Sequence, residues 1–166
     1  MKRVYLDTSA FIKLFVEEQD GETVQGIASL ANQNKITIVL SDWVLNESVG
    51  VVAKKFRKGL VDRKEASEIL TNIADMLEGV IERWNIESYS ITEDVIIGSR
   101  IIIQDVYPHA SDALHLFVAI VTKCDYFVTA DRKLALAIRD SVPRLMPINI
   151  QEPDDIKLFL DDVDSK

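Results

Sequence analysis

The chain contains one cysteine, Cys124, and two histidines, His109 and His115, among its 166 residues. A single cysteine excludes an internal disulfide and a cysteine-based zinc site, and two histidines exclude a histidine-rich metal site. There are six glycines, none of them clustered, so the Gly-x-Gly-x-x-Gly loop of dinucleotide-binding proteins is also missing. These absences exclude disulfide scaffolds, cysteine-based zinc sites, histidine-rich metal sites and the glycine-rich loop of dinucleotide-binding domains.

Long hydrophobic runs and an excess of positive charge are missing as well. No apolar stretch approaches the ~18 residues that a membrane-spanning helix needs, and Asp7 interrupts the segment that would form the core of a signal peptide. We therefore expect a cytoplasmic protein with no membrane contact. The net charge of −8 argues against broad, nonspecific nucleic-acid binding. It leaves open an enzyme acting on nucleic acid, because metal ions can offset the acid in a pocket.

One local basic cluster stands out against this acidic background. It consists of Lys54, Lys55, Arg57 and Lys58, near the end of a predicted helix. These side chains could hold the phosphates of an RNA backbone. They could equally be a solvated helix end, where the helix dipole favours cations.

The rest of the chain alternates short apolar runs with helical patterns, at a length that suits one domain. Alternating strands and helices predict an α/β fold, a three-layer α/β/α sandwich with a mainly parallel central sheet. Residues 1–150 should form the main domain, and residues 151–166 a C-terminal helix and acidic tail of the same domain. The predicted strands cover residues 4–6, 36–40, 86–91, 126–129 and 146–150, the last as an edge strand. The predicted helices cover residues 8–17, 22–31, 42–58, 62–84, 92–104, 111–123, 131–139 and 154–160.

Four acids stand where a solvated surface acid is not expected. Asp7 and Asp131 follow apolar strands, Asp112 opens an almost wholly apolar helix, and Glu47 interrupts an apolar helical stretch. In parallel sheets, ligands bind beyond the carboxyl ends of the strands, where Asp7 and Asp131 are expected. A pocket of acids repels itself unless a cation fills it, and Mg²⁺ prefers oxygen ligands of this kind.

Each acid also has a simpler interpretation. Asp7, Asp112 and Asp131 stand at or near helix starts, where Asp is a favoured N-cap that contributes ~1 kcal/mol. Glu47 lies too far into its helix to cap it, but it could belong to an exposed polar face. His115, one turn after Asp112, is more simply a core histidine with satisfied hydrogen bonds.

The order of the acids and their flanking residues resembles a known family. The matching segments are Val4–Ala10, Asn46–Glu47, Ser111–His115 and Phe127–Asp131. Together they resemble the PIN-domain nucleases, and particularly the VapC-type toxins of prokaryotic toxin–antitoxin modules. The resemblance extends from about Val4 to Ile150.

This resemblance implies an endoribonuclease that hydrolyses RNA with one or two Mg²⁺ or Mn²⁺ ions. It also implies a homodimer and a small antitoxin protein encoded nearby. By the same resemblance, the metal-binding catalytic acids are Asp7, Glu47, Asp112 and Asp131, supported by Thr129 and Ser9. Many relatives have a second acid after the last of these, whereas this chain continues Arg132-Lys133-Leu134, so the number of metal ions stays open.

Phosphodiester hydrolysis needs an in-line water, neutralised phosphate charge and help for the leaving oxygen, all of which divalent metals can supply. We assign Asp7 and Asp112 to a first ion, with Glu47 binding it directly or through water. Asp131 would bind a second ion or orient the attacking water. Thr129 and Ser9 would fix the orientation of the acids.

Two other classes compete with the nuclease interpretation. Another metal-dependent phosphohydrolase is one, although haloacid-dehalogenase-like phosphatases use a second Asp where this chain has Ser9. The other is a catalytically silent PIN-fold module that binds RNA or protein. The intact acids argue against it, because uncompensated charges held together are costly.

Overall fold

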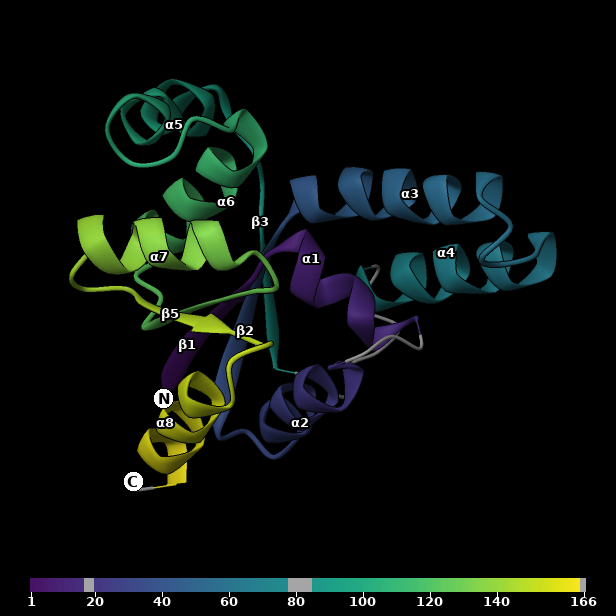
Figure 1. The fold of residues 1–166 in the computed structure, drawn as a ribbon, viewed down its shortest axis with the longest axis horizontal. Coiled ribbons are helices and arrows are strands. Elements are labelled where there is room, and N and C mark those ends of the chain that lie inside the picture. Colours follow the sequence, from purple (N-terminus) through teal and green to yellow (C-terminus); the bar gives the residue numbers. More distant parts are fainter. Residues whose placement is uncertain (17–19, 78–84, 165–166) are drawn as a thin grey trace.

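The protein is described here by a computed structural model that covers residues 1–16, 20–77 and 85–164 (Figure 1). Five strands form one sheet in the order β3-β2-β1-β4-β5, and every neighbouring pair is parallel. The prediction of a parallel α/β sheet with the last strand at an edge is therefore confirmed. The strands are β1 (Lys2–Leu6), β2 (Ile36–Ser41), β3 (Ile86–Tyr89), β4 (Tyr126–Thr129) and β5 (Met146–Asn149).

The central strands are buried on both faces, as their continuous apolar sequences predict. Successive side chains of a strand point to opposite faces, so Val4 and Leu6 of β1 join one core and Tyr5 joins the other. Strand β4 divides in the same way, with Val128 in the first core and Phe127 in the second. The Tyr5 and Phe127 rings stack with centroids 5.4 Å apart.

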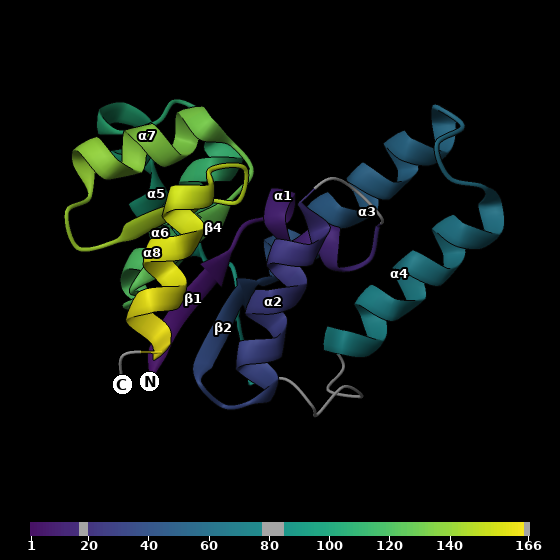
Figure 2. The same ribbon diagram turned by 60° about the horizontal axis from the view of Figure 1, so that its bottom comes forward.

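Helices cover both faces of the sheet and complete the predicted three layers. Figures 1 and 2 show α2 (Gly21–Asn32) and α8 (Pro153–Asp164) on one face. The other face is covered by α5 (Glu93–Asp105), α6 (Ala110–Val121) and α7 (Arg132–Ser141). Within the described parts of the chain, no helix is long and apolar enough to cross a membrane.

Two antiparallel helices form an arm that extends from the sheet in Figure 2: α3 (Asp42–Arg57) and α4 (Arg63–Leu77). The helix predicted over 42–58 ends as expected, with Lys58 as the C-cap of α3, and the following Gly59 has a φ of 68°, in the left-handed region that glycine adopts readily. Asp62 and Glu65 each accept a hydrogen bond from the other's backbone N–H, at 2.8 and 2.7 Å, and cap α4. The helix predicted over 62–84 thus starts as expected, and its last part, 78–84, lies outside the described residues.

The helix predicted over 8–17 is shorter than expected within the described residues, and residue 17 lies outside them. It consists of α1 (Thr8–Phe11) followed by the 3-10 turn η1 (Ile12–Leu14). Ala10, Phe11 and Ile12 are consecutive and all buried, because the segment packs between α2, α3 and the end of β4. A helix enclosed on all sides must fit the space available, so tertiary packing overrides the local helical pattern here.

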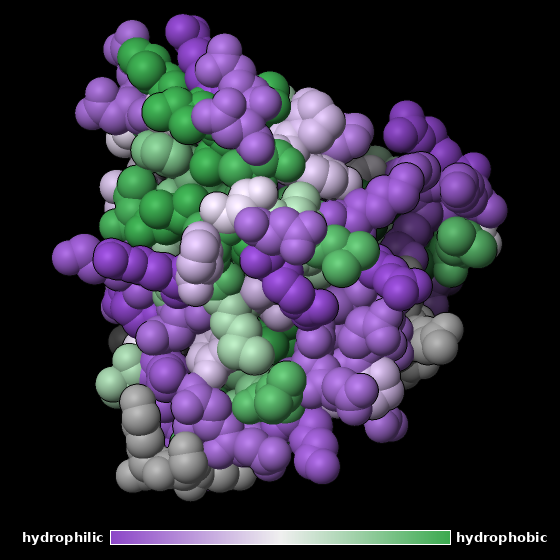
Figure 3. Space-filling model, turned by 60° about the vertical axis from the view of Figure 1, so that its left-hand side comes forward, coloured by the Kyte–Doolittle hydropathy of each residue, from purple (hydrophilic) through white to green (hydrophobic). Residues whose placement is uncertain are grey.

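One face of the protein carries exposed apolar side chains on α5 and α6. Ile97 and Ile101 of α5 are 50% and 61% exposed, whereas Ile102 is buried in the core. Figure 3 shows apolar side chains gathered in the upper part of this face. The run of three isoleucines at 101–103 is thus divided between core and surface.

Candidate active site

A cavity of about 390 Å³ opens where β1 and β4 end, between these strands and helices α3 and α6. All four acids predicted from the sequence line it. The position is the one expected for a ligand site in a parallel α/β sheet, beyond the carboxyl ends of the strands. The lining residues are Asp7, Thr8, Ser9, Glu47, Gly50, Val51, Lys54, Asp112, His115 and Asp131.

Asp7 is 4% exposed and stands between the end of β1 and the start of α1. Its Oδ1 accepts hydrogen bonds from the Ala10 backbone N–H at 2.9 Å and from the Ser9 hydroxyl at 2.7 Å. The capping interpretation of Asp7 is therefore confirmed, and the same residue also lines the cavity. Burial raises the pKa of Asp7, although hydrogen bonds from Thr129 and Ser9 oppose the rise.

Asp131 also combines a cap with a place in the cavity. Its Oδ1 accepts from the backbone N–H groups of Lys133 and Leu134 at the start of α7, at 2.8 and 3.1 Å. The capping interpretation fails for Asp112, because His109 holds the N-cap position of α6. Burial, followed by the negative charges of Asp7 and Asp131, raises the pKa of Asp112 to about 6. The negative charges of Asp7 and Asp131 thus act on Asp112 across the cavity that all three line.

Glu47 is held by three donors, one from α1 and two from α6. Its Oε2 accepts from His115 Nε2 at 2.7 Å and from the Thr8 hydroxyl, and its Oε1 accepts from the Ser111 hydroxyl. Partial burial favours the neutral acid, but the hydrogen bonds from His115, Ser111 and Thr8 outweigh it and lower the pKa of Glu47 to about 2. Glu47 is therefore an oriented, ionised carboxylate. The prediction of an exposed polar face is wrong for this side chain.

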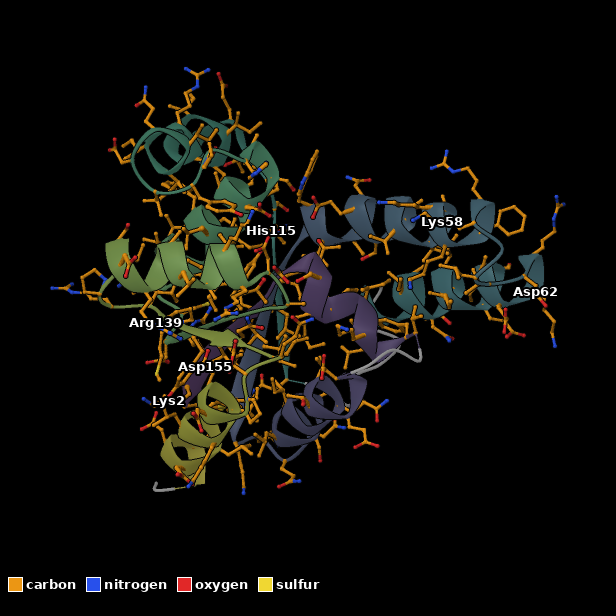
Figure 4. The ribbon with its side chains drawn as sticks, in the orientation of Figure 1. Lys2, Lys58, Asp62, His115, Arg139 and Asp155 are labelled. Atoms are coloured by element: carbon orange, nitrogen blue, oxygen red, sulfur yellow. The ribbon has the colours of Figure 1, made fainter. Side chains whose placement is uncertain are left out.

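His115 is 1% exposed, and both of its ring nitrogens have partners. Nδ1 lies 2.8 Å from the Tyr5 hydroxyl, which is also hydrogen-bonded to the Ser41 hydroxyl at 2.9 Å. The expectation of a core histidine with satisfied hydrogen bonds is confirmed. Its direct contact with Glu47 was not expected from the sequence, and it places His115 at the base of the cavity, near the middle of Figure 4.

Ser9 and Thr129 connect the end of β1 to the end of β4. The Ser9 hydroxyl accepts from the Ala130 N–H at 2.8 Å and lies 3.3 Å from the Thr129 hydroxyl. Thr129 is fully buried, and its hydroxyl accepts from the Asp131 N–H at 2.9 Å. These contacts hold the backbone around two of the acids.

The basic cluster is divided by the structure. Lys54 lines the cavity, two turns after Glu47 on the same face of α3. Lys55, Arg57 and Lys58 are not part of the lining. Figure 4 shows Lys58 at the outer end of the arm, well away from His115.

Sequence reasoning missed three side chains around the acids. Ser111 contacts Glu47, and Trp43 donates its indole N–H to the Ser111 hydroxyl at 2.9 Å. Tyr107 is hydrogen-bonded to Asp131, and burial together with the charges of Asp131 and Asp112 raises its pKa. Helical spacing offered a signal for Trp43, one turn before Glu47. Tyr107 belongs to a loop and gave no such signal.

The side chains around the cavity fit a hard divalent cation. They provide carboxylate oxygens, which are the ligands that Mg²⁺ and Mn²⁺ prefer. Among the residues that the structure describes, no three His, Cys, Asp or Glu side chains are already assembled as a metal cluster. An ionised carboxylate has about four lone-pair positions, and three donors contact Glu47, two of them at Oε2. About one position therefore remains, on Oε1.

Comparisons with known proteins agree with this architecture. A sequence model of the PIN domain matches residues 3–133. The structure resembles the crystal structure of Mycobacterium tuberculosis VapC20, a toxin that cleaves the sarcin–ricin loop, with a TM-score of 0.57. The two chains are 13% identical, and the alignment covers 81% of this chain and 94% of the other. A comparison with curated protein sequences finds no match.

The family match spans most of the chain, from β1 to the first turn of α7. It includes the segments that carry Asp7, Glu47, Asp112 and Asp131. At 13% identity the structural likeness concerns the fold, and it agrees with the match in sequence. This chain belongs to the PIN domain family.

Proposed function

We propose that this protein is a Mg²⁺- or Mn²⁺-dependent endoribonuclease and the toxin component of a toxin–antitoxin module. The observation that carries the proposal is the single cavity lined by Asp7, Glu47, Asp112 and Asp131, which four separate segments bring together. Membership of the PIN domain family supports nuclease chemistry. The likeness in fold to a VapC toxin supports the toxin role.

The four acids would have different roles in metal binding. Asp7 and Asp112 would hold a first ion, and Glu47 would contact it directly or through water. Asp131 would hold a second ion or orient the attacking water, while Ser9 and Thr129 keep the ends of β1 and β4 in place. A bound divalent ion would neutralise the phosphate and activate the water.

Lys54 is the cation best placed for the RNA backbone, because it lines the same cavity as the acids. Lys55, Arg57 and Lys58 would contact phosphates farther along the strand. Lys58 is eleven residues after Glu47, so it lies about 16 Å away along the helix at ~1.5 Å per residue. That distance suits a flanking phosphate rather than the scissile one.

The decisive experiment compares wild type with Asp7→Asn in an RNA cleavage assay with Mn²⁺. Asn keeps a carbonyl oxygen for the cap of α1 but loses the charge, so the fold should persist. Loss of a metal ligand removes several kcal/mol of transition-state stabilisation, and cleavage should fall by ~100-fold or more. Chelator should abolish the wild-type activity.

Equal cleavage by wild type and a folded Asp7→Asn variant would refute the active-site assignment. RNA binding without cleavage in Mg²⁺ and Mn²⁺ would favour the catalytically silent PIN-fold module. Cleavage of small phosphate esters in place of RNA would favour another metal-dependent phosphohydrolase.

The toxin role has a separate test in cells. Induced expression should arrest bacterial growth, and co-expression of a small antitoxin protein encoded nearby should relieve the arrest. Cytoplasmic expression should suffice, because we expect the protein to act in the cytoplasm. We also propose a homodimer, supported by the exposed apolar residues of α5, and sedimentation analysis would show its mass.

A further inference from the structure

The assignment of the four acids gives no role to His115, which contacts one of them directly. His115 is buried between the sheet and the axis of α6, and among the described residues its ring nitrogens lie within hydrogen-bonding distance of Tyr5, Glu47 and Thr8. Its Nδ1 faces the Tyr5 hydroxyl of β1, and Tyr5 is in turn bonded to Ser41 at the end of β2. The imidazole is thus fixed from the side of the sheet.

The other ring nitrogen meets the carboxylate at the base of the cavity. Nε2 lies 2.7 Å from Glu47 Oε2, and a carboxylate can only accept, so the imidazole donates. Thr8 donates to the same oxygen. Oε2 therefore has both of its lone-pair positions occupied, whereas Oε1 has only the Ser111 contact.

We propose that His115 is a positioning residue, which saturates Oε2 of Glu47 and thereby leaves Oε1 as the oxygen available to the metal or its water. The inference rests on the proposed function, because it assumes that Glu47 serves a metal site. Tyr5 and Ser41 contribute indirectly, because their hydrogen bonds fix the orientation of the imidazole ring. In this role His115 acts through Glu47 and is not itself a ligand of the metal.

Two substitutions at position 115 separate hydrogen bonding from packing. The amide of His115→Asn lies near the place of Nδ1, so it can reach Tyr5 but not Glu47. The amide of His115→Gln lies near the place of Nε2, so it can still donate to Glu47. We expect His115→Asn to weaken Mn²⁺ binding by about 10- to 100-fold, as other losses of groups that orient metal ligands do. His115→Gln should recover most of that loss.

Tyr5→Phe tests the support behind the imidazole without touching the cavity. It should weaken Mn²⁺ binding in the wild-type background and have no further effect in the His115→Gln background, because there is then no imidazole to orient. Tyr126→Phe is the matched control. Tyr126 is also a strand tyrosine with a bonded hydroxyl, but its partner is Asp162, outside the cavity.

Mn²⁺ affinity is measured by paramagnetic resonance titration, and cleavage and thermal unfolding are measured on the same samples. The proposal is overturned if folded His115→Asn binds Mn²⁺ like wild type, or if His115→Asn and His115→Gln lose affinity equally. If His115→Asn does not fold, Tyr5→Phe is compared in the wild-type and His115→Gln backgrounds instead. The proposal is then overturned if Tyr5→Phe leaves the Mn²⁺ affinity of the wild-type background unchanged. If the wild-type protein binds Mn²⁺ but does not cut RNA, the proposed ribonuclease function is refuted and the role of His115 is not. If the wild-type protein binds no Mn²⁺, the proposed function and the role of His115 are both refuted.

Discussion

Asp112→Asn should stabilise the metal-free protein, although it removes a residue of the proposed site. Burial and the charges of Asp7 and Asp131 raise the pKa of Asp112 from the ordinary value of 3.8 to about 6. At neutral pH the ionised carboxylate therefore destabilises the fold, and asparagine removes that charge.

The size of the effect follows from the pKa. A rise of about two units corresponds to about 3 kcal/mol at most, and the partial exposure of Asp112 reduces this to about 1–2 kcal/mol. Asp112 lies in the first turn of α6, where a negative charge gains ~0.3–1 kcal/mol from the helix dipole. The net gain of Asp112→Asn should be about 1 kcal/mol, or about 2–4 °C in melting temperature for a domain of this size.

The stability difference between Asp112→Asn and wild type should depend on pH. Because the folded pKa lies above the unfolded one, the penalty is absent below about pH 4 and fully present above about pH 6. The advantage of Asp112→Asn over wild type should therefore shrink by roughly half between pH 7.5 and pH 5. Added Mn²⁺ should reverse the order, because wild type gains about 2.7 kcal/mol at a hundredfold excess over the dissociation constant and the variant does not.

The assay is thermal unfolding with chelator and with Mn²⁺, at both pH values. Asp94→Asn is the matched control: Asp94 also lies in the first turn of its helix, α5, but it is exposed and outside the cavity. It should lose ~0.3–1 kcal/mol of dipole stabilisation and so shift the melting temperature downward. A metal-free Asp112→Asn protein that also melts lower, with an unchanged response to Mn²⁺, would refute the reasoning.

Two further predictions concern residues of α3, namely Gly50 in the wall of the cavity and the lysines beyond it. Gly50 lies within α3, and a Cβ added there would meet no atom within 4 Å. Gly50→Ala should therefore stabilise the protein by ~0.5–1 kcal/mol, because alanine favours the helix more than glycine does. It should also slow RNA cleavage, because the added methyl group narrows the cavity that Gly50 lines. Gly26→Ala, at an equally open site in α2, should stabilise it without slowing cleavage, and equal activity of the two variants would count against the cavity as the RNA site. Replacing Lys54 and Lys58 by Gln should each reduce the salt dependence of RNA binding by ~1 unit of slope and spare Mn²⁺ binding. An unchanged slope in the binding titration would make these lysines an ordinary solvated helix end.

The strands and the acids that follow them could be predicted from local sequence. Runs such as Ile36–Leu40 and Tyr126–Thr129 are apolar throughout, which is typical of strands buried on both faces. Parallel strands share one carboxyl edge, so Asp7 and Asp131 could be expected to lie near one another before any coordinates were known. The caps at these two aspartates follow from equally local chemistry.

The arrangement around Glu47 could not be predicted in this way. Its donors are Thr8, Ser111 and His115, which are 39, 64 and 68 residues away along the chain. The local sequence shows only that Glu47 is a polar residue in an apolar stretch. Such a residue can lie on a solvent-exposed helix face or in a buried hydrogen-bond network. Hydrogen bonds between distant segments depend on the packing of α1, α3 and α6 against the ends of the strands. That packing orients Glu47, brings Lys54 rather than Lys58 to the cavity, and shortens the helix after Asp7.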